Sequence, residues 1–304
     1  MVRGLRELIR SRFGKRATRI GLVAALTVGG VGAGVFAATN AFADSCFTWN
    51  RNLSEGSSGD DVKQLQIRLS GYPGRGAVLG IDGAFGPATK AALIRFQQAY
   101  GLTANGVANA AVFNKLYALQ DNDCTPIHFS YAELNDCNTS WAGGNVSAST
   151  AKRNALISMW KLEAMRHALG DKPIRVTSGF RSKACNDAVG GASSSRHLFG
   201  NAVDLGKTPH SLCTLAKQAR YHGFNGILGP GYPGHSDHTH VDHRTSRFWS
   251  AAQCGVSNSS RAMTTDPANP AGAGIEGIGA DDWNQTETGP ADAVDPITGA
   301  GNQD

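Results

Sequence analysis

The sequence predicts an α+β protein made of two folded modules, a small three-helix module followed by a larger module of helices and strands. Three short amphipathic helical patterns fall within residues 44–124. Residues 125–256 instead combine one long helical pattern with short strands and glycine-rich loops, which is typical of a compact α+β domain. We call these segments the helical module and the mixed module. The chain has 304 residues, enough for two hydrophobic cores.

In the helical module, apolar residues recur three times at the spacing of a helix face. The three stripes are Val62, Leu65, Gln66 and Leu69, then Ala92, Leu93, Phe96 and Tyr100, and then Val112, Phe113, Leu116 and Leu119. Pro87 occupies a favourable first helical position after Gly86. A short internal repeat relates residues 82–86 to residues 105–109, 23 positions later. Each copy has turn-forming residues and precedes a predicted helix.

In the mixed module, a long amphipathic helix is expected over residues 149–169, with Gly170 as the residue that ends it. Short strands are expected further along the chain, at residues 174–178, 201–205, 226–228 and 238–242. Strands interspersed with helices and long glycine-rich loops indicate a compact α+β domain.

Residues 1–43 have the pattern of a secretory signal peptide. Seven basic residues and one acidic residue precede or flank an apolar stretch at 20–38, and Ala41-Phe42-Ala43 then supplies a small-x-small cleavage site. A membrane anchor is the alternative, because the 19-residue stretch is just long enough to span a bilayer. Five glycines in the stretch and the cleavage site favour export, and the absence of an Arg-Arg pair favours the general secretory route.

The charge of the chain is distributed unevenly. Residues 257–304 carry eight acidic residues and one basic residue without helical or strand periodicity, which predicts a disordered acidic tail. The whole chain has a net charge of +5, and residues 44–256 alone have a net charge of +6. In an exported protein this mild basic character suits an anionic extracellular polymer such as a cell wall better than a nucleic acid.

Six cysteines lie within the two modules, an even number that predicts three disulfides in an exported protein. Six cysteines permit 15 pairings, and the sequence alone does not choose among them. Because Cys46 and Cys124 bracket the helical module, we favour sequential pairing, 46–124, 137–185 and 213–254. The chain has no C-x-x-C pair, so a cysteine-rich zinc site is not expected.

Two segments of the mixed module carry candidate metal ligands. Residues 195–204 contain His197 and Asp204, and residues 235–240 contain three further histidines, among them His240. Imidazole and carboxylate groups are good zinc ligands, and a catalytic zinc needs three protein ligands and one open position. The alternative is a chance cluster, since four of the nine histidines fall between residues 235 and 243.

The helical module resembles the three-helix peptidoglycan-binding domain. The resemblance rests on GSSGDDVKQLQ at 56–66, IDGAFGPAT at 81–89 and FQQAYGL at 96–102. It implies docking onto the peptides or the glycan of the cell wall. A helical spacer without a ligand is the alternative, because most of these residues are core and turn positions that identify a fold rather than a binding face.

The mixed module resembles the zinc D-Ala-D-Ala carboxypeptidase family, which is related to lysostaphin-type and vancomycin-resistance peptidases. The resemblance rests on Ser-x-His-x-x-Gly-x-Ala-x-Asp at 195–204 followed by Asp-x-x-His at 237–240, and it extends over about residues 128–255. The order of the modules and the six cysteines also match secreted actinobacterial members. The resemblance implies an α+β zinc peptidase domain with one zinc ion per chain.

The resemblance implies that His197, Asp204 and His240 are the zinc ligands and that Asp237 is the general base. Zinc lowers the pKa of a bound water from ~15.7 toward ~7, and a nearby carboxylate can then take its proton. Alternation along a strand adds a constraint: Asp237 and His240 can reach one metal only if the regular strand begins at about His238. The same alternation places His238 beside the zinc, as a supporting group or as a rival to His240.

Further roles follow from the same resemblance. Arg181 would capture the terminal carboxylate of the substrate, for which a planar guanidinium is suited, and a plain surface charge is the alternative. His235 would stabilise the anionic tetrahedral intermediate. Ser195 is expected to orient His197 through a loop hydrogen bond, since no base is evident that would make it a nucleophile. The remaining histidines receive no role: His128, His167, His210, His222 and His243.

The expected protein is therefore a secreted, wall-bound, monomeric zinc carboxypeptidase that removes the terminal D-Ala from peptidoglycan stem peptides. Cross-links are a second candidate substrate, because they contain a D-Ala-linked bond of the same stereochemical type. No nucleic-acid partner is expected, and no membrane partner once the signal peptide is removed. Two alternatives stay open, an endopeptidase acting on another bond such as L-Ala–D-Glu and a non-catalytic wall-binding protein with a structural zinc. The three-ligand count and the base candidate Asp237 argue against the second alternative.

Overall fold

A computed structural model describes residues 46–135, 137 and 140–258, all of which belong to one unit of the chain, Phe42–Asp304. The predicted signal peptide at 1–43 lies outside the described residues. The predicted acidic tail at 257–304 also lies outside them, except for its first two residues. Within the described part of the chain, every helix is too short or too polar to cross a bilayer.

The helical module contains the three predicted helices. They are α1 (Asp60–Leu69), α2 (Pro87–Ala99) and α3 (Ala110–Ala118). Their apolar stripes meet in one hydrophobic core, in which Leu65, Leu93, Phe96 and Leu116 are fully buried.

The short repeat at residues 82–86 and 105–109 of the helical module has a structural cause. Buried Gln66 accepts a hydrogen bond from the backbone N–H of Gly83 at 2.8 Å, and buried Gln97 accepts one from Gly106 at 2.9 Å. Both glycines have positive φ, 81° and 70°, which favours glycine at these turns. Helix α1 therefore fixes the turn that leads into α2, and α2 fixes the turn that leads into α3.

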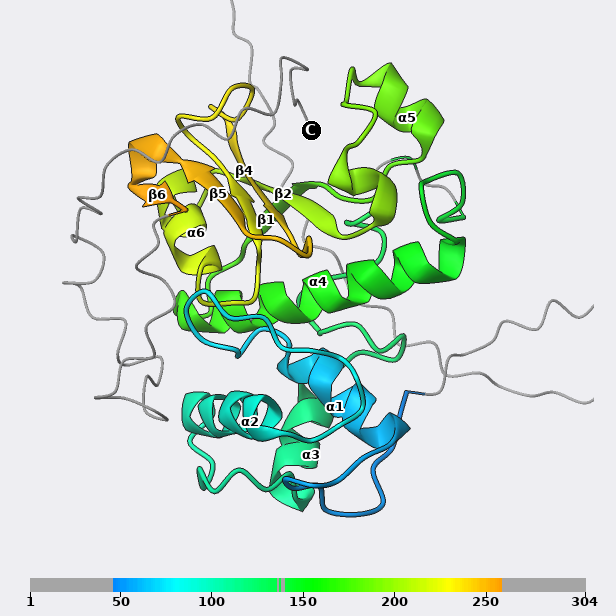
Figure 1. Ribbon diagram of the computed structural model, residues 1–304, viewed down its shortest axis with the longest axis vertical. Coiled ribbons are helices and arrows are strands. Elements are labelled where there is room, and N and C mark those ends of the chain that lie inside the picture. The colour runs from blue at the N-terminus through cyan, green and yellow to red at the C-terminus, as the bar shows by residue number, and fades with distance from the viewer. Residues whose placement is uncertain (1–45, 136, 138–139, 259–304) are drawn as a thin grey trace, which may run out of the picture. The chain divides into compact units, whose positions relative to one another are not determined.

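The mixed module is a six-stranded sheet with helices around it (Figure 1). Its helices are α4 (Ala148–Ala168), α5 (Lys183–Ala188), α6 (Leu212–Ala219) and the short 3-10 helices η1 (Arg196–Phe199) and η2 (Ala252–Cys254). Its strands are β1 (Arg175–Ser178), β2 (Ala202–Gly206), β3 (Gly226–Leu228), β4 (His238–Asp242), β5 (Phe248–Ala251) and β6 (Val256–Ser257). The long helix and four strands agree with the sequence prediction to within one residue at each end.

The strands follow the order β1-β2-β4-β3-β5-β6, and all neighbours are antiparallel except the β3–β5 pair. The central strand β2 is buried along its whole length, as is most of β4. Strands buried on both faces read as short apolar runs rather than as alternating patterns. The strands β5 and β6 and the short helices α5 and α6 were not predicted, because their segments are too short for a clear periodicity.

All three predicted disulfides are confirmed: Cys46–Cys124, Cys137–Cys185 and Cys213–Cys254. The first closes a loop of 78 residues around the helical module, and the other two lie within the mixed module. Each bridge is expected to add about 2–4 kcal/mol by restricting the unfolded chain.

Helix α4 lies between the sheet and the helical module (Figure 1) and joins the two hydrophobic cores. Ile67 of α1 packs against Ile157 and Trp160 of α4. Gly71 approaches α4 so closely that an added Cβ would lie 2.5 Å from the Cβ of Ala164, which leaves no room for a side chain at this position. The two modules are thus packed directly against each other.

One buried titratable group bonds across this contact, and a second lies beside it within the mixed module. The Nδ1 of His222 donates a hydrogen bond to the carbonyl of Gly71 at 2.7 Å, and the Nζ of Lys161 donates one to the carbonyl of Gly223 at 2.6 Å. Burial lowers the pKa of His222 to about 4 and that of Lys161 to about 7, because neither charged form is well solvated there.

The pKa of His222 predicts acid sensitivity. An exposed histidine in the unfolded chain has a pKa of about 6.5, so the unfolded state binds more protons than the folded state between about pH 6.5 and pH 4. The stability that neutral His222 supports is therefore fully present above pH 6.5. It is lost as the pH falls toward 4, by an amount on the order of 3 kcal/mol.

Urea unfolding of the native protein and of the His222→Gln variant at pH 7 and pH 4.5 measures this contribution. We expect the variant to lose less stability on acidification than the native protein does, although it starts less stable at pH 7. Equal losses in the two proteins would show that His222 does not report on acid stability.

Candidate metal centre and active site

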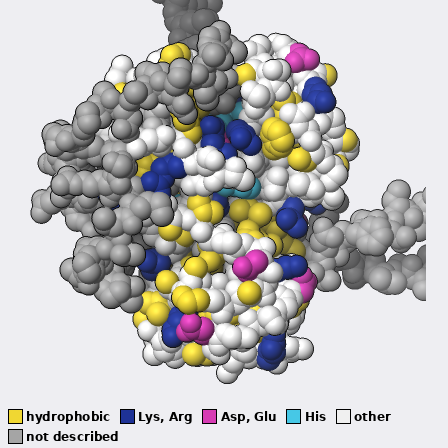
Figure 2. Space-filling model, viewed as in Figure 1, with side chains coloured by type: hydrophobic (Ala, Val, Ile, Leu, Met, Phe, Trp, Pro, Cys, Tyr) yellow, Lys and Arg dark blue, Asp and Glu magenta, His cyan; other side chains and the backbone are white. Residues whose placement is uncertain are grey.

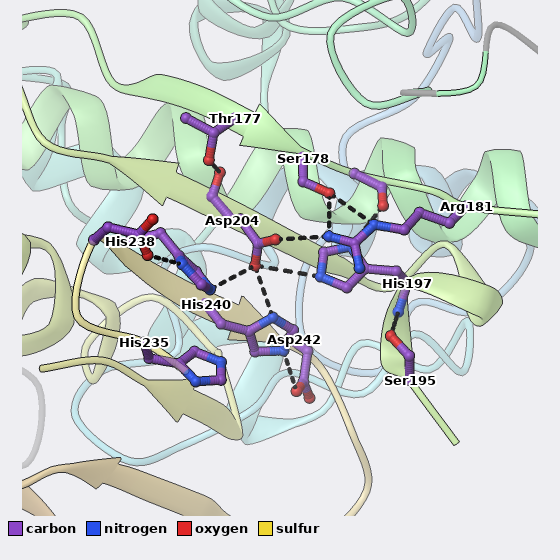
Figure 3. A network of polar contacts seen from close by, with 12 residues as sticks. Thr177, Ser178, Arg181, Ser195, His197, Asp204, His235, His238, His240 and Asp242 are labelled. Atoms are coloured by element: carbon purple, nitrogen blue, oxygen red, sulfur yellow. Dashed lines mark hydrogen bonds and ion pairs between the residues drawn. The ribbon is translucent and has the colours of Figure 1, made fainter. Parts of the chain in front are cut away.

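The pairing of β2 with β4 brings two of the predicted ligands together. In the antiparallel register Asp204 lies directly opposite His240. Directly opposed residues project on the same face of a sheet, with their Cβ atoms about 5 Å apart. The two side chains therefore meet, and the Nδ1 of His240 lies 3.0 Å from the Oδ1 of Asp204 (Figure 3).

His197 reaches the same place from the 3-10 helix η1, which precedes β2. The side chain of Ser195 caps this helix by accepting a hydrogen bond from the backbone N–H of His197 at 3.3 Å. This is the supporting hydrogen bond predicted for Ser195. The helix ends at Gly200, whose φ is 68° and where an added Cβ would lie 2.5 Å from the carbonyl oxygen of Ala151. Only glycine fits this turn, which directs the chain from η1 into β2.

His197, Asp204 and His240 form a buried group whose ligand atoms all lie within 4.8 Å of one another. The Nε2 of His197 is 3.2 Å from the Oδ1 of Asp204. Both histidines are fully buried, and Asp204 is 4% exposed.

The contacts behind the two histidines determine which ring nitrogens face Asp204. The Nδ1 of His197 donates to the carbonyl of Gly179 at 2.6 Å, and the Nε2 of His240 lies 3.0 Å from the Oδ2 of Asp242. With the outer nitrogens protonated, the inner nitrogens of neutral rings carry lone pairs.

Two lone pairs and a carboxylate oxygen thus converge, and buried acceptors at this separation repel each other unless a cation lies between them. The Nε2 of His197 is a buried nitrogen without a hydrogen-bond partner among the described residues. The donor set, two imidazoles and one carboxylate, is that of a catalytic zinc site, so the residues fit this metal.

Asp242 is a buried acidic side chain held by several hydrogen bonds. It is fully buried, and it accepts hydrogen bonds from the backbone N–H of Arg244 at 2.8 Å and from the guanidinium of the same residue. Gly226 lies opposite it on β3, where an added Cβ would lie 2.1 Å from its Oδ2. The glycine leaves the space that the carboxylate occupies, and the carboxylate in turn fixes the ring of His240.

The electrostatics of the two carboxylates follow from these contacts. Burial by itself raises the pKa of Asp204 and of Asp242, because it disfavours the charged form. For Asp204, positive charge on His197 and His240, when these rings are protonated, outweighs burial and holds the pKa well below its usual range. For Asp242, hydrogen bonds from His240 and Arg244 lower the pKa in the same way. Both groups are therefore carboxylates at neutral pH.

Arg181 is buried beside the candidate ligands. Its Nη2 lies 3.1 Å from the Oδ2 of Asp204, and its Nη2 and Nε both donate to the hydroxyl of Ser178. The guanidinium is thus held in a fixed orientation at the edge of the site rather than at the surface.

Asp237 does not contact the three-residue group. Its side chain is 85% exposed, and its Oδ1 accepts a hydrogen bond from the Nδ1 of His238 at 2.9 Å. This hydrogen bond lowers the pKa of Asp237. His238 faces inward from the same strand face as His240, with its Nε2 3.8 Å from the Oδ1 of Asp204. Strand β4 begins at His238, as the sequence argument required.

His235 lies beside His238 and His240, next to the candidate metal ligands. Its ring centroid lies 4.6 Å from that of His238 and 6.0 Å from that of His240, and its Nδ1 donates to the carbonyl of Pro233 at 2.8 Å. The space-filling view shows histidine side chains bordered by Lys and Arg side chains on this face of the molecule (Figure 2).

The structure therefore brings five of the six predicted site residues close together. The sixth, Asp237, contacts His238, and the ring of His238 lies between Asp237 and Asp204. Sequence reasoning missed Asp242. The signal was present, because a strand over residues 238–242 puts Asp242 on the same face as His240. The carbonyl of Gly179 left no signal, since any residue type carries a backbone carbonyl.

Comparison with known proteins agrees with this geometry. Residues 127–242 match the peptidase M15 family, and residues 58–116 match a peptidoglycan binding domain family. A curated relative, the zinc D-Ala-D-Ala carboxypeptidase of Streptomyces albus G, is 65% identical over 213 residues, which are 70% of this chain and 84% of the relative. The chain belongs to the peptidase M15 family.

Two further matches concern shorter stretches. An uncharacterised protein of Kitasatospora aureofaciens is 38% identical over 77 residues, which are 25% of this chain and 63% of that protein. A crystal structure of a peptidoglycan-binding protein from Clostridioides difficile in complex with glutamine hydroxamate is 39% identical and covers 21% of this chain and 39% of that one, with a TM-score of 0.20.

The role of Asp242 in this M15 site can be tested by the Asp242→Asn substitution. The amide keeps the shape of the side chain but removes the charge that supports His240, and loss of such a supporting carboxylate typically weakens metal binding about 10–100-fold. We expect a loss in that range, measured on the metal-free protein by competition with a chelator of known zinc affinity.

The exposed Asp187 on α5 offers a matched control, since Asp187→Asn removes one carboxylate away from the site. Thermal unfolding of both variants separates a specific loss of zinc affinity from a general loss of folding. Native zinc affinity in a folded Asp242→Asn protein would contradict the role given to Asp242.

Proposed function

We propose that the protein is a zinc-dependent carboxypeptidase that hydrolyses the terminal D-Ala-D-Ala bond of peptidoglycan stem peptides. The observation that carries this proposal is the buried convergence of two imidazole nitrogens and a carboxylate in a chain of the peptidase M15 family. The name of the Streptomyces albus G relative supplies the bond that is cut. The match to a peptidoglycan binding domain supports peptidoglycan as the polymer that carries the substrate.

In this proposal His197, Asp204 and His240 hold the zinc ion. Zinc, when bound, polarises the scissile carbonyl as a Lewis acid and lowers the pKa of a water from ~15.7 toward ~7. The protein contributes a fixed ligand geometry: the carbonyl of Gly179 and the carboxylate of Asp242 orient the two rings before any metal arrives.

Asp237 is proposed as the general base that takes a proton from the attacking water and passes it to the leaving amine. Its lowered pKa keeps the carboxylate ionised at neutral pH and so able to accept a proton. The carboxylate contacts His238 in the absence of substrate, and catalytic contacts commonly tighten only when substrate is bound.

Arg181 and His235 are proposed to stabilise two negative charges, the terminal carboxylate of the substrate and the oxyanion of the tetrahedral intermediate. Arg181 would bind the carboxylate at the end of the substrate while it also holds Asp204. His235 would donate a hydrogen bond from Nε2 to the oxygen that becomes negative in the tetrahedral intermediate. Because the carbonyl of Pro233 already accepts from Nδ1, this role requires the doubly protonated ring of His235.

The surroundings in which the enzyme would work follow from its chemistry. Three disulfides suit an oxidising compartment, and peptidoglycan lies outside the cytoplasm. We therefore propose a secreted, monomeric enzyme that acts at the cell wall, in which the helical module binds the wall.

The decisive experiment measures free D-alanine released by the purified protein from a soluble peptide that ends in D-Ala-D-Ala. We expect release that stops when a chelator removes zinc and returns when zinc is added. A peptide that ends in L-Ala-L-Ala serves as the matched control and should stay intact. Cleavage at another bond would contradict the carboxypeptidase proposal in favour of an endopeptidase, and no cleavage would favour a non-catalytic wall-binding protein.

Two variants separate metal binding from proton transfer. His197→Ala should lose both zinc and activity, because it removes a ligand from the three-residue group. Asp237→Ala should keep its zinc but lose about 10²–10⁴-fold in turnover, the usual contribution of a general base. Zinc content and kcat are measured on the same samples. A fully active Asp237→Ala protein, or a His197→Ala protein with its zinc and activity intact, would refute the assigned role.

A further inference from the structure

Strand β1 has an irregular register beside the candidate metal centre. Its pairing with β2 sets Ser178 opposite Asp204, where a regular continuation of the register would set Thr177 there. One residue of β1 is therefore extra, which makes this point a β-bulge, a feature that often re-aims a side chain next to an active site. The hydroxyl of Thr177 donates a hydrogen bond to the backbone carbonyl of Asp204 at 3.2 Å and so closes the bulge.

The bulge brings the side chain of Ser178 to the face of the sheet that carries the side chain of Asp204. Side chains alternate along a strand, so without the extra residue the side chain of Ser178 would point to the opposite face. Directly opposed residues instead project on the same face. Ser178 is also the one buried residue of β1. Backbone geometry thus places a hydroxyl group next to the carboxylate of a candidate metal ligand.

The hydroxyl of Ser178 holds one edge of the guanidinium of Arg181. Its Oγ accepts hydrogen bonds from Nε at 3.1 Å and from Nη2 at 2.6 Å (Figure 3). The same Nη2 lies 3.1 Å from the Oδ2 of Asp204. A guanidinium is planar, and its five N–H donors form a rigid fork, so contacts that fix one edge also fix the direction of the donors on the other edge.

The hydroxyl is a neutral acceptor, which matters for the charge of Arg181. A further carboxylate in place of Ser178 would offset the positive charge that attracts an anionic group of a substrate. The serine orients the guanidinium and leaves its charge unchanged. Both side chains belong to buried residues, each 8% exposed, and a hydrogen bond from a charged donor is stronger at such a place than in water. The contact therefore suits an arginine that has to stay both oriented and charged.

We propose that Ser178 is a positioning residue that orients Arg181 toward the terminal carboxylate of the substrate. Ser178 acts through the guanidinium and does not touch the substrate itself. An arginine that turns freely binds a carboxylate less well, because binding then has to restrict its side chain. The inference rests on the proposed function, and it names the residue through which Arg181 prefers substrates with a free carboxyl end.

The test compares two soluble peptides that end in D-Ala-D-Ala, one with a free terminal carboxylate and one with a terminal amide. We expect Ser178→Ala to lower kcat/KM for the acid about tenfold, mainly by raising KM, the effect of losing a hydrogen bond to a charged group. The kcat/KM for the amide should change little, so the preference for the acid should fall about tenfold. Ser178→Thr keeps a hydroxyl and should retain the native preference.

Ser250→Ala on β5 is the matched control and should keep native kinetics with both peptides. Ser250 is a half-buried serine, and the strands β2, β4 and β3 separate its strand from β1. Zinc content and thermal unfolding are measured on every variant, because Arg181 also contacts the candidate ligand Asp204. A folded, zinc-loaded Ser178→Ala protein with equal losses on both peptides would show a structural role only and would overturn the proposal. Unchanged kinetics in this variant would overturn it as well.

A second readout does not depend on activity. The Nε–H group of Arg181 gives a side-chain signal in NMR spectra of ¹⁵N-labelled protein, and Arg181→Lys identifies this signal by removing it. We expect a rigid group in the native protein and in Ser178→Thr, and an order parameter below about 0.6 in Ser178→Ala, the range of flexible groups. An equally rigid signal in Ser178→Ala would overturn the proposal. Failure of the carboxypeptidase proposal is distinguishable, because it shows as a lack of D-alanine release by the native protein.

Discussion

The antiparallel pairing of β2 with β4 is the contact on which the candidate metal centre depends, because it sets Asp204 directly opposite His240. The side chains of a strand alternate between its two faces, so a shift of one residue in this register would move one ligand to the other face of the sheet. Both strands are internal, with β1 beside β2 and β3 beside β4, and both are largely buried. The hydrophobic core that holds the sheet together therefore also fixes the metal ligands.

The fold brings together three acceptors, one ring nitrogen each from His197 and His240 and the carboxylate of Asp204. It also fixes both histidine rings through contacts on their far sides. Each histidine is held through the nitrogen that faces away from Asp204, one by a backbone carbonyl and the other by the carboxylate of Asp242. Two glycines make these contacts possible. Gly226 leaves room for Asp242, and Gly179 packs so tightly against Leu134 that no side chain would fit there. Close backbone approach, rather than a large side chain, creates the space for the site.

Much of the candidate site was predictable because its residues are close in sequence within two segments. Ser195, His197 and Asp204 lie in one segment, and the strand that carries His238 and His240 forms the other. The predicted strand range of 238–242 is confirmed, and alternation along it places His238 and His240 on one face, as the structure shows. The same rule extends to Asp242, which was overlooked. The strands β5 and β6 and the short helices α5 and α6 were not predictable, because their positions depend on contacts with distant parts of the chain rather than on local periodicity.

The sequence by itself determined the two modules, the helices α1 to α4 and the residue types that can bind zinc, since each of these depends on local spacing or composition. For the disulfides it favoured one of the 15 possible pairings, and the structure decided that this pairing forms. Only the tertiary structure decided which ring nitrogen of each histidine faces Asp204, and that the carboxylate of Asp237 contacts His238 rather than the ligands. The physical reason is the same in each case: a hydrogen bond or a packed contact joins groups that are distant in sequence, and no local pattern encodes its geometry.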